Sequence, residues 1–359
     1  MSQISAFAPG RVELLGNHTD YNEGLVLSAA IQLGVTAVGR RLSSGKIGLM
    51  SRQMSASAAW HGVLDEGFNR QNQWSDYPLG VVWALQQIGC RLGGFEVHFD
   101  STLPVGAGLS SSAALEVATA MVLSRLFHFN FELMELAKLC RKAENEFVGV
   151  QCGLLDQVSS LFGKEGHVVF LDCRSERVEQ IPFPQEMALL VIHSGVSHTL
   201  SGSEYNERRT ACFEAARLLG VSALRDATSQ QVLQIADSTF RKRALHITDE
   251  NARVVQAVAA LREGDVREFG SLMTASHRSS QKNFENSAPE LDILVELALE
   301  QNDVYGARLT GGGFGGAIIV LVPKQKAQHV AAQIVEAYGR RTGHIAKPIV
   351  CECGEGALF

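Results

Sequence analysis

The sequence predicts an α+β fold in two domains. Strand-like runs and helical patterns are mixed along the chain without the regular βαβ alternation of a doubly wound parallel sheet. The 359 residues, 46% of them hydrophobic, are enough for a large buried core and favour two domains over one. Because no Pro-rich or Ser-rich linker and no internal repeat divides the sequence, we expect a tight boundary between domains at residues 1–180 and 181–359.

The first hundred residues are expected to be mainly β-structure, and helices dominate after them. The predicted strands are Leu25–Arg40, Lys46–Ser51 and Phe95–Thr102, each bounded by turn residues. One helical pattern, Pro78–Ile88, lies between the second and third strands. Two helices, Ser111–Leu126 and Leu133–Glu146, follow, because both segments place apolar residues at helical spacing.

The second half alternates buried strands with helices. The predicted strands are His167–Cys173, Met187–His193 and Ala317–Val322. The predicted helices are Glu204–Leu219, Thr248–Glu263, Pro289–Gln301 and Gln325–Arg340. Gly220 and Gly264 are expected to end two of these helices, and Ser287 is a candidate N-cap for a third.

Composition excludes several classes of protein. A net charge of −6 and a pI near 6.0 argue against a nucleic-acid partner, which needs a basic surface. No basic leader and no run of 18 apolar residues appears, so we expect a cytoplasmic protein without a membrane partner. The seven cysteines lack a CxxC pair and the eleven histidines lack an HExxH motif, which argues against disulfides and catalytic zinc. We expect a monomer.

The segment Pro104–Ser112 is predicted to bind phosphate. It combines glycines with serines that enter a helix: Gly106, Gly108, Ser110, Ser111 and Ser112. Glycines let the backbone approach an anion, a helix N-terminus offers unpaired N–H groups, and hydroxyls add donors or a magnesium ligand. The alternative is that the serines only cap the helix. The GK[ST] ending of a Walker A loop is missing, which disfavours a P-loop protein.

A second glycine cluster contains a formal GxGxxG at Gly311, Gly313 and Gly316. A dinucleotide fingerprint needs a helix after it, whereas β-branched residues follow here, so we reject that interpretation. A structural turn and a ligand contact both remain open for this loop.

Polar residues cluster near the N-terminus, in the order Arg11, Asn17, His18, Asp20 and Tyr21. Fixed donors and acceptors suit a polyhydroxylated ligand, because each desolvated hydroxyl needs a partner. A sugar is the natural candidate, although His18 taken singly could be satisfied by local bonds. With the phosphate loop, the cluster predicts a small-molecule kinase that transfers the γ-phosphoryl group of ATP to a sugar.

Two carboxylates in the middle of the chain are candidates for chemistry. Asp156 stands in an apolar setting just after Gly153, where it could be catalytic or could cap a helix. Glu144 lies on the preceding helix. If both face the phosphate loop, Glu144 and a serine could hold Mg²⁺ through oxygen ligands.

Together these residues resemble the galactokinase branch of the GHMP sugar and metabolite kinases. Three motifs stand in the order of the family: GRVELLGNHTDYNEG, PVGAGLSSSAALEVAT and LTGGGFGGA. They span nearly the whole chain, and the combination is highly specific. The resemblance implies an N-terminal domain like the second domain of ribosomal protein S5 and a ferredoxin-like C-terminal domain, with the active site between them.

The resemblance also implies roles for individual residues. Asp156 would face the anomeric hydroxyl of galactose, and Arg11 would lie between that carboxylate and the transferred phosphoryl group. The sugar would contact Asn17, His18, Asp20, Gly153 and Tyr205. ATP would contact Trp74, near the adenine, and Gly106, Gly108, Ser110 and Ser111, around the phosphates. Mg²⁺ would be held by Ser112 and Glu144.

The chain departs from the family pattern GRVNLIGEHTDY at two polar positions, where it has Glu13 and Asn17. The family's glutamate at position 17 contacts the hydroxymethyl end of the sugar, so its loss could retune one hydrogen bond or could admit galacturonate. Gln151 also replaces a common proline. A further alternative is a sugar- or ATP-responsive regulator without turnover, but such a protein would be expected to have lost catalytic positions that this chain retains.

Overall fold

The computed structural model describes residues 3–55, 58–104, 106, 108–197 and 201–358, which form two β-sheets with helices around them. The strands of the first sheet are β1 (Ile4–Leu15), β2 (Leu25–Arg41), β3 (Lys46–Ser51), β4 (Trp60–Val63), β5 (Phe95–Ser101), β6 (His167–Asp172) and β7 (Arg177–Pro182). Those of the second are β8 (Met187–Ser197), β9 (Gly306–Thr310), β10 (Gly315–Pro323) and β11 (Lys347–Cys351). The predicted α+β class is confirmed.

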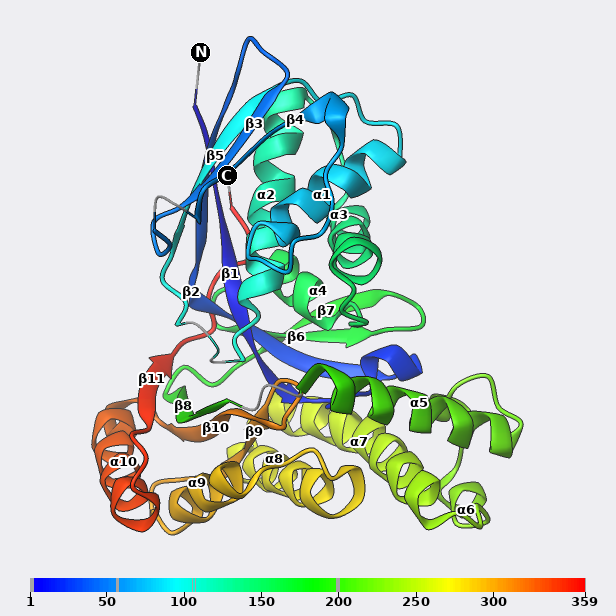
Figure 1. Cartoon of the computed structure of the whole chain (residues 1–359). Coiled ribbons are helices and arrows are strands. Elements are labelled where there is room, and N and C mark those ends of the chain that lie inside the picture. The colour runs from blue at the N-terminus through cyan, green and yellow to red at the C-terminus, as the bar shows by residue number, and fades with distance from the viewer. Residues whose placement is uncertain (1–2, 56–57, 105, 107, 198–200, 359) are drawn as a thin grey trace.

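The first sheet has the strand order β4-β3-β5-β2-β6-β7, with β1 paired to β2. Its helices are α1 (Asp76–Gln87), α2 (Ser111–Phe127), α3 (Leu133–Lys142) and α4 (Leu155–Phe162), and they gather on one face of the sheet (Figure 1). Helices α2 and α4 pack directly on β1 and β2, while α1 and α3 pack against α2. The strand β1 therefore lies between the phosphate loop that starts α2 and the second half of the chain.

Helix α2 is buried on almost all sides and carries several small residues. Ala113, Ala114, Ala118 and Ala120 are fully buried there. Helix α3 begins with a capping box, in which Glu132 and Glu135 satisfy each other's backbone N–H groups. It continues into a π-helical turn, Ala143–Val148, a distortion that often marks functional sites.

The second sheet is antiparallel, in the order β11-β8-β10-β9. The helices of this half are α5 (Ser201–Leu219), α6 (Ser229–Val232), α7 (Ser238–Glu263), α8 (Val266–Ser279), α9 (Pro289–Leu299) and α10 (Ala327–Thr342). Helices α9 and α10 bury an apolar face against β8 and β10, and α8 lies along β9 (Figure 1). The glycine cluster 311–316 joins β9 to β10, strand to strand, as the rejection of a dinucleotide fingerprint requires.

Two boundary predictions were wrong. Helix α7 begins at Ser238 rather than Thr248, because Asp237 caps it by accepting hydrogen bonds from two backbone N–H groups. Ser287 does not cap α9. The N-cap is Ala288, with proline at the first helical position, and the Ser287 hydroxyl instead donates to Asp292 at 2.5 Å.

The chain returns to the first sheet at its C-terminal end. Isolated bridges pair Cys353 with Ile31 and Leu358 with Phe7, and Figure 1 shows this last segment rising from β11 toward the N-terminal strands. We propose the domain boundary at residue 180, within β7 and shortly before β8, with this tail packed on the N-terminal domain. Within the described ranges, no helix is both long and apolar enough to cross a membrane.

Candidate functional site

A cavity of about 540 Å³ lies where the two halves meet, a volume typical of small-molecule sites. Its walls come from β1 and the turn after it, the loop 149–153, α4, α5 and the glycine cluster. The sequence-predicted residues that line it are Arg11, Asn17, His18, Asp20, Glu144, Gly153, Asp156 and Tyr205. Residues almost two hundred positions apart in the sequence thus share one wall.

The centre of the cavity holds an ion pair between Arg11 and Asp156. The Arg11 Nε and Nη2 atoms lie 2.8 and 2.7 Å from Asp156 Oδ1, and Nη1 donates to the Gly108 carbonyl at 2.7 Å. The guanidinium is 7% exposed, whereas the carboxylate is 25% exposed and reachable from the cavity. The pair therefore connects the polar N-terminal cluster, α4 and the phosphate loop.

Asp156 lies in the first turn of α4, so the placement of this helix positions its side chain. It does not cap the helix. The N-cap of α4 is Leu154, and no side chain caps this helix. Two serines fix α4 against the sheet: Ser159 bonds the hydroxyl of Ser28 at 2.6 Å, and Ser160 donates to the Pro9 carbonyl at 2.7 Å. The capping interpretation of Asp156 is therefore wrong.

The phosphate loop reaches the same centre from α2. Ser110 is the N-cap of α2 but adopts a left-handed backbone (φ 55°) and makes no capping bond. Its hydroxyl donates to Asp156 Oδ2 at 2.6 Å instead. Ser111 and Ser112 start the helix, where backbone N–H groups lack helical partners. Val105 and Ala107 lie outside the described residues.

Glu144 and Ser112 meet beside the ion pair through a side-chain hydrogen bond. Burial, and then the negative charge of Asp156, raises the pKa of Glu144 to about 7. Gln157 holds the carboxylate by donating to it at 2.8 Å. The described part of the chain contains no group of three or more His, Cys, Asp or Glu side chains arranged to hold a metal.

Asp20 faces the cavity with its carboxylate against the backbone of Gly153. A Cβ at position 153 would lie 2.0 Å from Asp20 Oδ2, so only glycine fits there. Burial is the main reason that the pKa of Asp20 rises to about 7, and the charges of Asp156 and Glu13 add to the shift.

His18 is neutral and fully hydrogen-bonded. Its Nε2 lies 3.0 Å from the Gly312 carbonyl and must donate there, so Nδ1 accepts from the Tyr21 hydroxyl at 2.8 Å. Burial lowers the pKa of the imidazole to about 3. Its ring centroid lies 4.8 Å from that of Tyr205. Because protein partners occupy both ring nitrogens, His18 shapes the wall rather than offering a free nitrogen.

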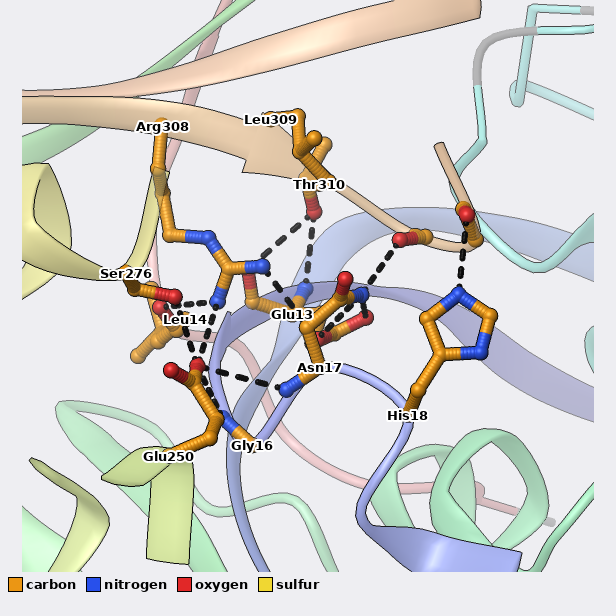
Figure 2. A network of polar contacts seen from close by, with 12 residues as sticks. Glu13, Leu14, Gly16, Asn17, His18, Glu250, Ser276, Arg308, Leu309 and Thr310 are labelled. Carbon is orange, nitrogen blue, oxygen red and sulfur yellow. Dashed lines mark hydrogen bonds and ion pairs between the residues drawn. The ribbon is translucent and has the colours of Figure 1, made fainter. Parts of the chain in front are cut away.

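Asn17 is also occupied by protein partners, and one of them is the carboxylate of Glu13. The Asn17 amide donates to Glu13 Oε1 at 3.0 Å and to the Gly311 carbonyl at 2.8 Å (Figure 2). Its oxygen accepts from Asn286 at 2.8 Å. An amide at position 17 therefore does not leave this region without a carboxylate. The Glu13 carboxylate lies beside the amide and lines the same cavity.

A buried charge network that sequence reasoning missed supports this corner from the second half of the chain. Arg308 is fully buried and lies between Glu13, at 3.4 Å, and Glu250, at 3.7 Å (Figure 2). Glu250 accepts from the backbone N–H groups of Gly16 and Asn17 at 3.0 and 3.4 Å. Helix α7 thereby clamps the polar N-terminal turn. The sequence signal for this network was Arg308, the only charged residue in the short strand β9.

We expect Glu250→Gln to lower the free energy of unfolding by about 3–5 kcal/mol. The substitution removes the negative charge that balances the positive charges of Arg308 and Arg253. The Arg253 and Arg308 charges hold the pKa of Glu250 below its usual value despite burial. The carboxylate therefore stabilises the fold above about pH 4 and stops doing so as the pH falls through its folded pKa. Urea unfolding at pH 7 and pH 3.5 measures both effects. Glu263→Gln, on the exposed end of α7, is the control, and equal stability of the two variants would contradict the network's role.

Trp74 lies outside the cavity. Its indole N–H donates to the Ala58 carbonyl at 3.0 Å, and its ring meets Phe99 edge-on with centroids 6.0 Å apart. The side chain is only partly covered. Gly106 is also outside the cavity, and its carbonyl accepts from His193 at 2.9 Å.

Family models and sequence relatives both show that this chain is similar to the galactokinases of the GHMP kinase family. The galactokinase galactose-binding signature matches residues 2–41, the GHMP kinases N-terminal domain matches residues 76–164, and the GHMP kinases C-terminal domain matches residues 257–340. The galactokinase of Pyrococcus furiosus is 39% identical over 356 residues, 99% of each chain. The galactokinase of Thermotoga petrophila is 40% identical over 343 residues, 94% of each chain.

Solved structures agree with the sequence relatives. Lactococcus lactis galactokinase, crystallised with galactose, superposes with a TM-score of 0.96 at 33% identity, covering 99% of this chain and 95% of that one. The mevalonate kinase of Methanococcus jannaschii superposes with a TM-score of 0.71 at 20% identity, covering 98% of each chain, and shows a shared fold. The predicted two-domain GHMP kinase architecture is confirmed.

Proposed function

The chain belongs to the galactokinase family of GHMP kinases, and from this premise we propose that it transfers the γ-phosphoryl group of ATP to the anomeric hydroxyl of galactose. One observation carries the proposal. The Arg11–Asp156 pair stands in a cavity of sugar size and touches the phosphate loop through the Gly108 carbonyl and the Ser110 hydroxyl. A hydroxyl bound against Asp156 would therefore meet a phosphate held at the start of α2.

Asp156 orients the sugar hydroxyl and accepts its proton as the new O–P bond forms. Phosphoryl transfer passes through a loose transition state that asks little of the nucleophile, so positioning matters more than base strength. Arg11 fixes Asp156 on one side and presents positive charge where negative charge develops on the transferred group.

The start of α2 supplies the phosphate contacts. Gly106 and Gly108 keep the loop backbone accessible, and Ser111 lies in the first turn, where the helix dipole favours an anion. We assign Ser110 to the phosphates as well, and its hydroxyl links this end of the loop to Asp156. We assign Trp74 to the adenine end, which its partly exposed indole allows.

The residues present fit Mg²⁺. Ser112 and Glu144 place a hydroxyl and a buried carboxylate together, and both are hard oxygen donors. A site with one carboxylate is typical of Mg²⁺ that also binds substrate phosphates. When bound, Mg²⁺ neutralises charge on the phosphates.

We expect Glu144→Gln to raise the Mg²⁺ concentration needed for half-maximal activity by at least about tenfold, because it removes the only carboxylate of the proposed site. The KM for galactose should stay within about twofold, since the sugar contacts are elsewhere. Titrating MgCl₂ at fixed ATP measures the effect. Glu146→Gln, exposed on the same π-helical turn, is the matched control. An unchanged Mg²⁺ requirement in Glu144→Gln would refute the assignment.

Asp20, Gly153 and Tyr205 form the sugar wall, with His18 and Asn17 behind it. A carboxylate accepts hydrogen bonds from sugar hydroxyls best when ionised. Because the pKa of Asp20 is raised to about 7, protonation below that pH removes this capacity.

We therefore expect galactose to bind about tenfold more tightly at pH 8 than at pH 6, following the ionised fraction of Asp20. The raised pKa also predicts that the ligand-free fold loses stability as the pH rises from about 4 through 7, because only the folded state keeps the proton there. Calorimetric titration with galactose, without nucleotide, measures the affinity. Asp20→Asn should flatten the profile, and a flat profile in the wild type would contradict the role of Asp20.

An ADP-release assay across galactose, glucose, N-acetylgalactosamine, arabinose and galacturonate tests the substrate. Release with galactose is expected. Release with galacturonate but not galactose would support the alternative raised by Asn17, and sugar binding without release would favour a regulator. We further propose a cytoplasmic monomer, since its substrate ATP is cytoplasmic, its seven cysteines are free thiols and its exposed large apolar side chains are scattered.

A further inference from the structure

A further buried carboxylate in the sugar cavity, that of Glu13, has no role in the family motif. Its side chain is 6% exposed and lines the cavity. Burial raises its pKa, while the charges of Arg308 and Arg11 act in the opposite direction. A buried carboxylate on the wall of a ligand site needs polar partners.

The carboxylate of Glu13 can accept a further hydrogen bond. Its Oε1 atom receives Asn17 at 3.0 Å and lies 3.4 Å from Arg308, whereas Oε2 has one long bond, 3.3 Å, to Asn17. A carboxylate can accept about four hydrogen bonds, so Oε2 can take another. By contrast, protein partners use both functions of the Asn17 amide, which is 1% exposed.

The strand β1 separates Glu13 from Arg11, beside the reacting hydroxyl, by about the width of one hexose ring. Arg11 and Glu13 pair with Ala30 and Ser28 in unbroken register, so their side chains leave the same face of β1. Two residues along a strand span about 7 Å. This is comparable to the distance across a pyranose from the anomeric oxygen to the far edge of the ring. With the anomeric hydroxyl at Asp156, Glu13 faces that far edge.

We propose that the Glu13 carboxylate, presented by Asn17 and Arg308, accepts a hydrogen bond from a hydroxyl at the far edge of galactose and selects sugars that carry it. The inference rests on the proposed galactose kinase activity. A site built to bond a hydroxyl discriminates strongly against an analogue without it, because the buried acceptor is then left unpaired.

The same carboxylate argues against galacturonate. Asp20 is close enough to Glu13 for the two charges to interact. A sugar carboxylate at the far edge would add a third negative charge beside them, which is unfavourable in a desolvated site. Glu13 thus supplies the charge that Asn17 lacks.

The test compares kcat/KM for galactose, 6-deoxygalactose and 4-deoxygalactose in the wild type and in Glu13→Gln. We expect the wild type to prefer galactose over at least one deoxy sugar by about a hundredfold, and the variant to lose at least about tenfold of that preference. Unchanged preferences for both deoxy sugars would overturn the inference. A wild type without activity on galactose would instead overturn the kinase assignment.

Two further variants separate specificity from support of the fold. Glu250→Gln removes the other carboxylate beside Arg308 but keeps the contacts of Glu13 with Asn17 and Arg308, and Glu250 does not line the cavity, so the variant should lower stability but keep the galactose preference. The exchange variant Glu13→Asn/Asn17→Glu keeps one carboxylate and one amide in the pair, and remains measurable if Glu13→Gln does not fold. Its preference for galactose should exceed that of Glu13→Asn. Equal preferences in the exchange and single variants, or loss of preference in Glu250→Gln, would contradict the role of Glu13.

Discussion

Asp156→Asn is expected to lower kcat by about 10²–10⁴-fold while changing the KM for galactose by less than about threefold. The substitution keeps the shape of the side chain and an oxygen that can accept from Arg11, so the cavity should persist. It removes the group that takes the proton from the sugar hydroxyl. It also leaves the charge of Arg11 without its carboxylate, although the Gly108 carbonyl still bonds the guanidinium.

The matched control for this variant is Glu116→Gln. Glu116 is a fully buried carboxyl close enough to Asp156 for their charges to interact, and burial raises its pKa well above the usual range. Glutamine keeps the size and shape of this buried side chain. Rapid-quench measurements of kcat should separate the two variants. A correctly folded Asp156→Asn protein with near-wild-type turnover would refute the catalytic role.

Arg11→Lys is expected to lower kcat by about 10²–10³-fold. Lysine keeps the charge but loses the planar fork that bonds Asp156 and the Gly108 carbonyl together. The expected loss arises from misplaced charge in the transition state, so it should exceed the change in KM for either substrate.

The control for Arg11 is Arg225→Lys, which breaks another two-pronged contact between an arginine and an aspartate, that with Asp172. That pair does not line the cavity. Steady-state kinetics and thermal unfolding of both variants distinguish catalysis from stability. An equal decrease of kcat in Arg225→Lys and Arg11→Lys would contradict a specific catalytic role for Arg11.

Local sequence patterns were sufficient to predict most of the helices and strands. They also identified the residues that meet around Asp156. The predicted helix Ser111–Leu126 became α2, because apolar periodicity and the serine-rich start agree with its packing. The start of α7 was missed because its first turns, STFRKRALHI, carry three basic residues that hide the apolar face formed by Ala244 and Ile247. Tertiary packing, rather than local periodicity, decides such a segment.

The support of the site was not predictable from local patterns. Glu250 contacts the turn after β1, and Arg308 contacts the end of β1 itself, each from more than two hundred positions away. No short motif encodes such contacts. The partners of Asn17 were not predictable for the same reason. Its amide is bound by Glu13, Gly311 and Asn286, and the last two approach only when the second half folds against β1.

Phosphorus NMR of the product formed from galactose and MgATP tests the central claim most directly. The account predicts one new sugar phosphate, whose phosphorus signal is split by the anomeric proton, together with one ADP for each sugar consumed. Phosphate on any other hydroxyl, or inorganic phosphate as the only product, would contradict the placement of the anomeric hydroxyl against Asp156 and Arg11.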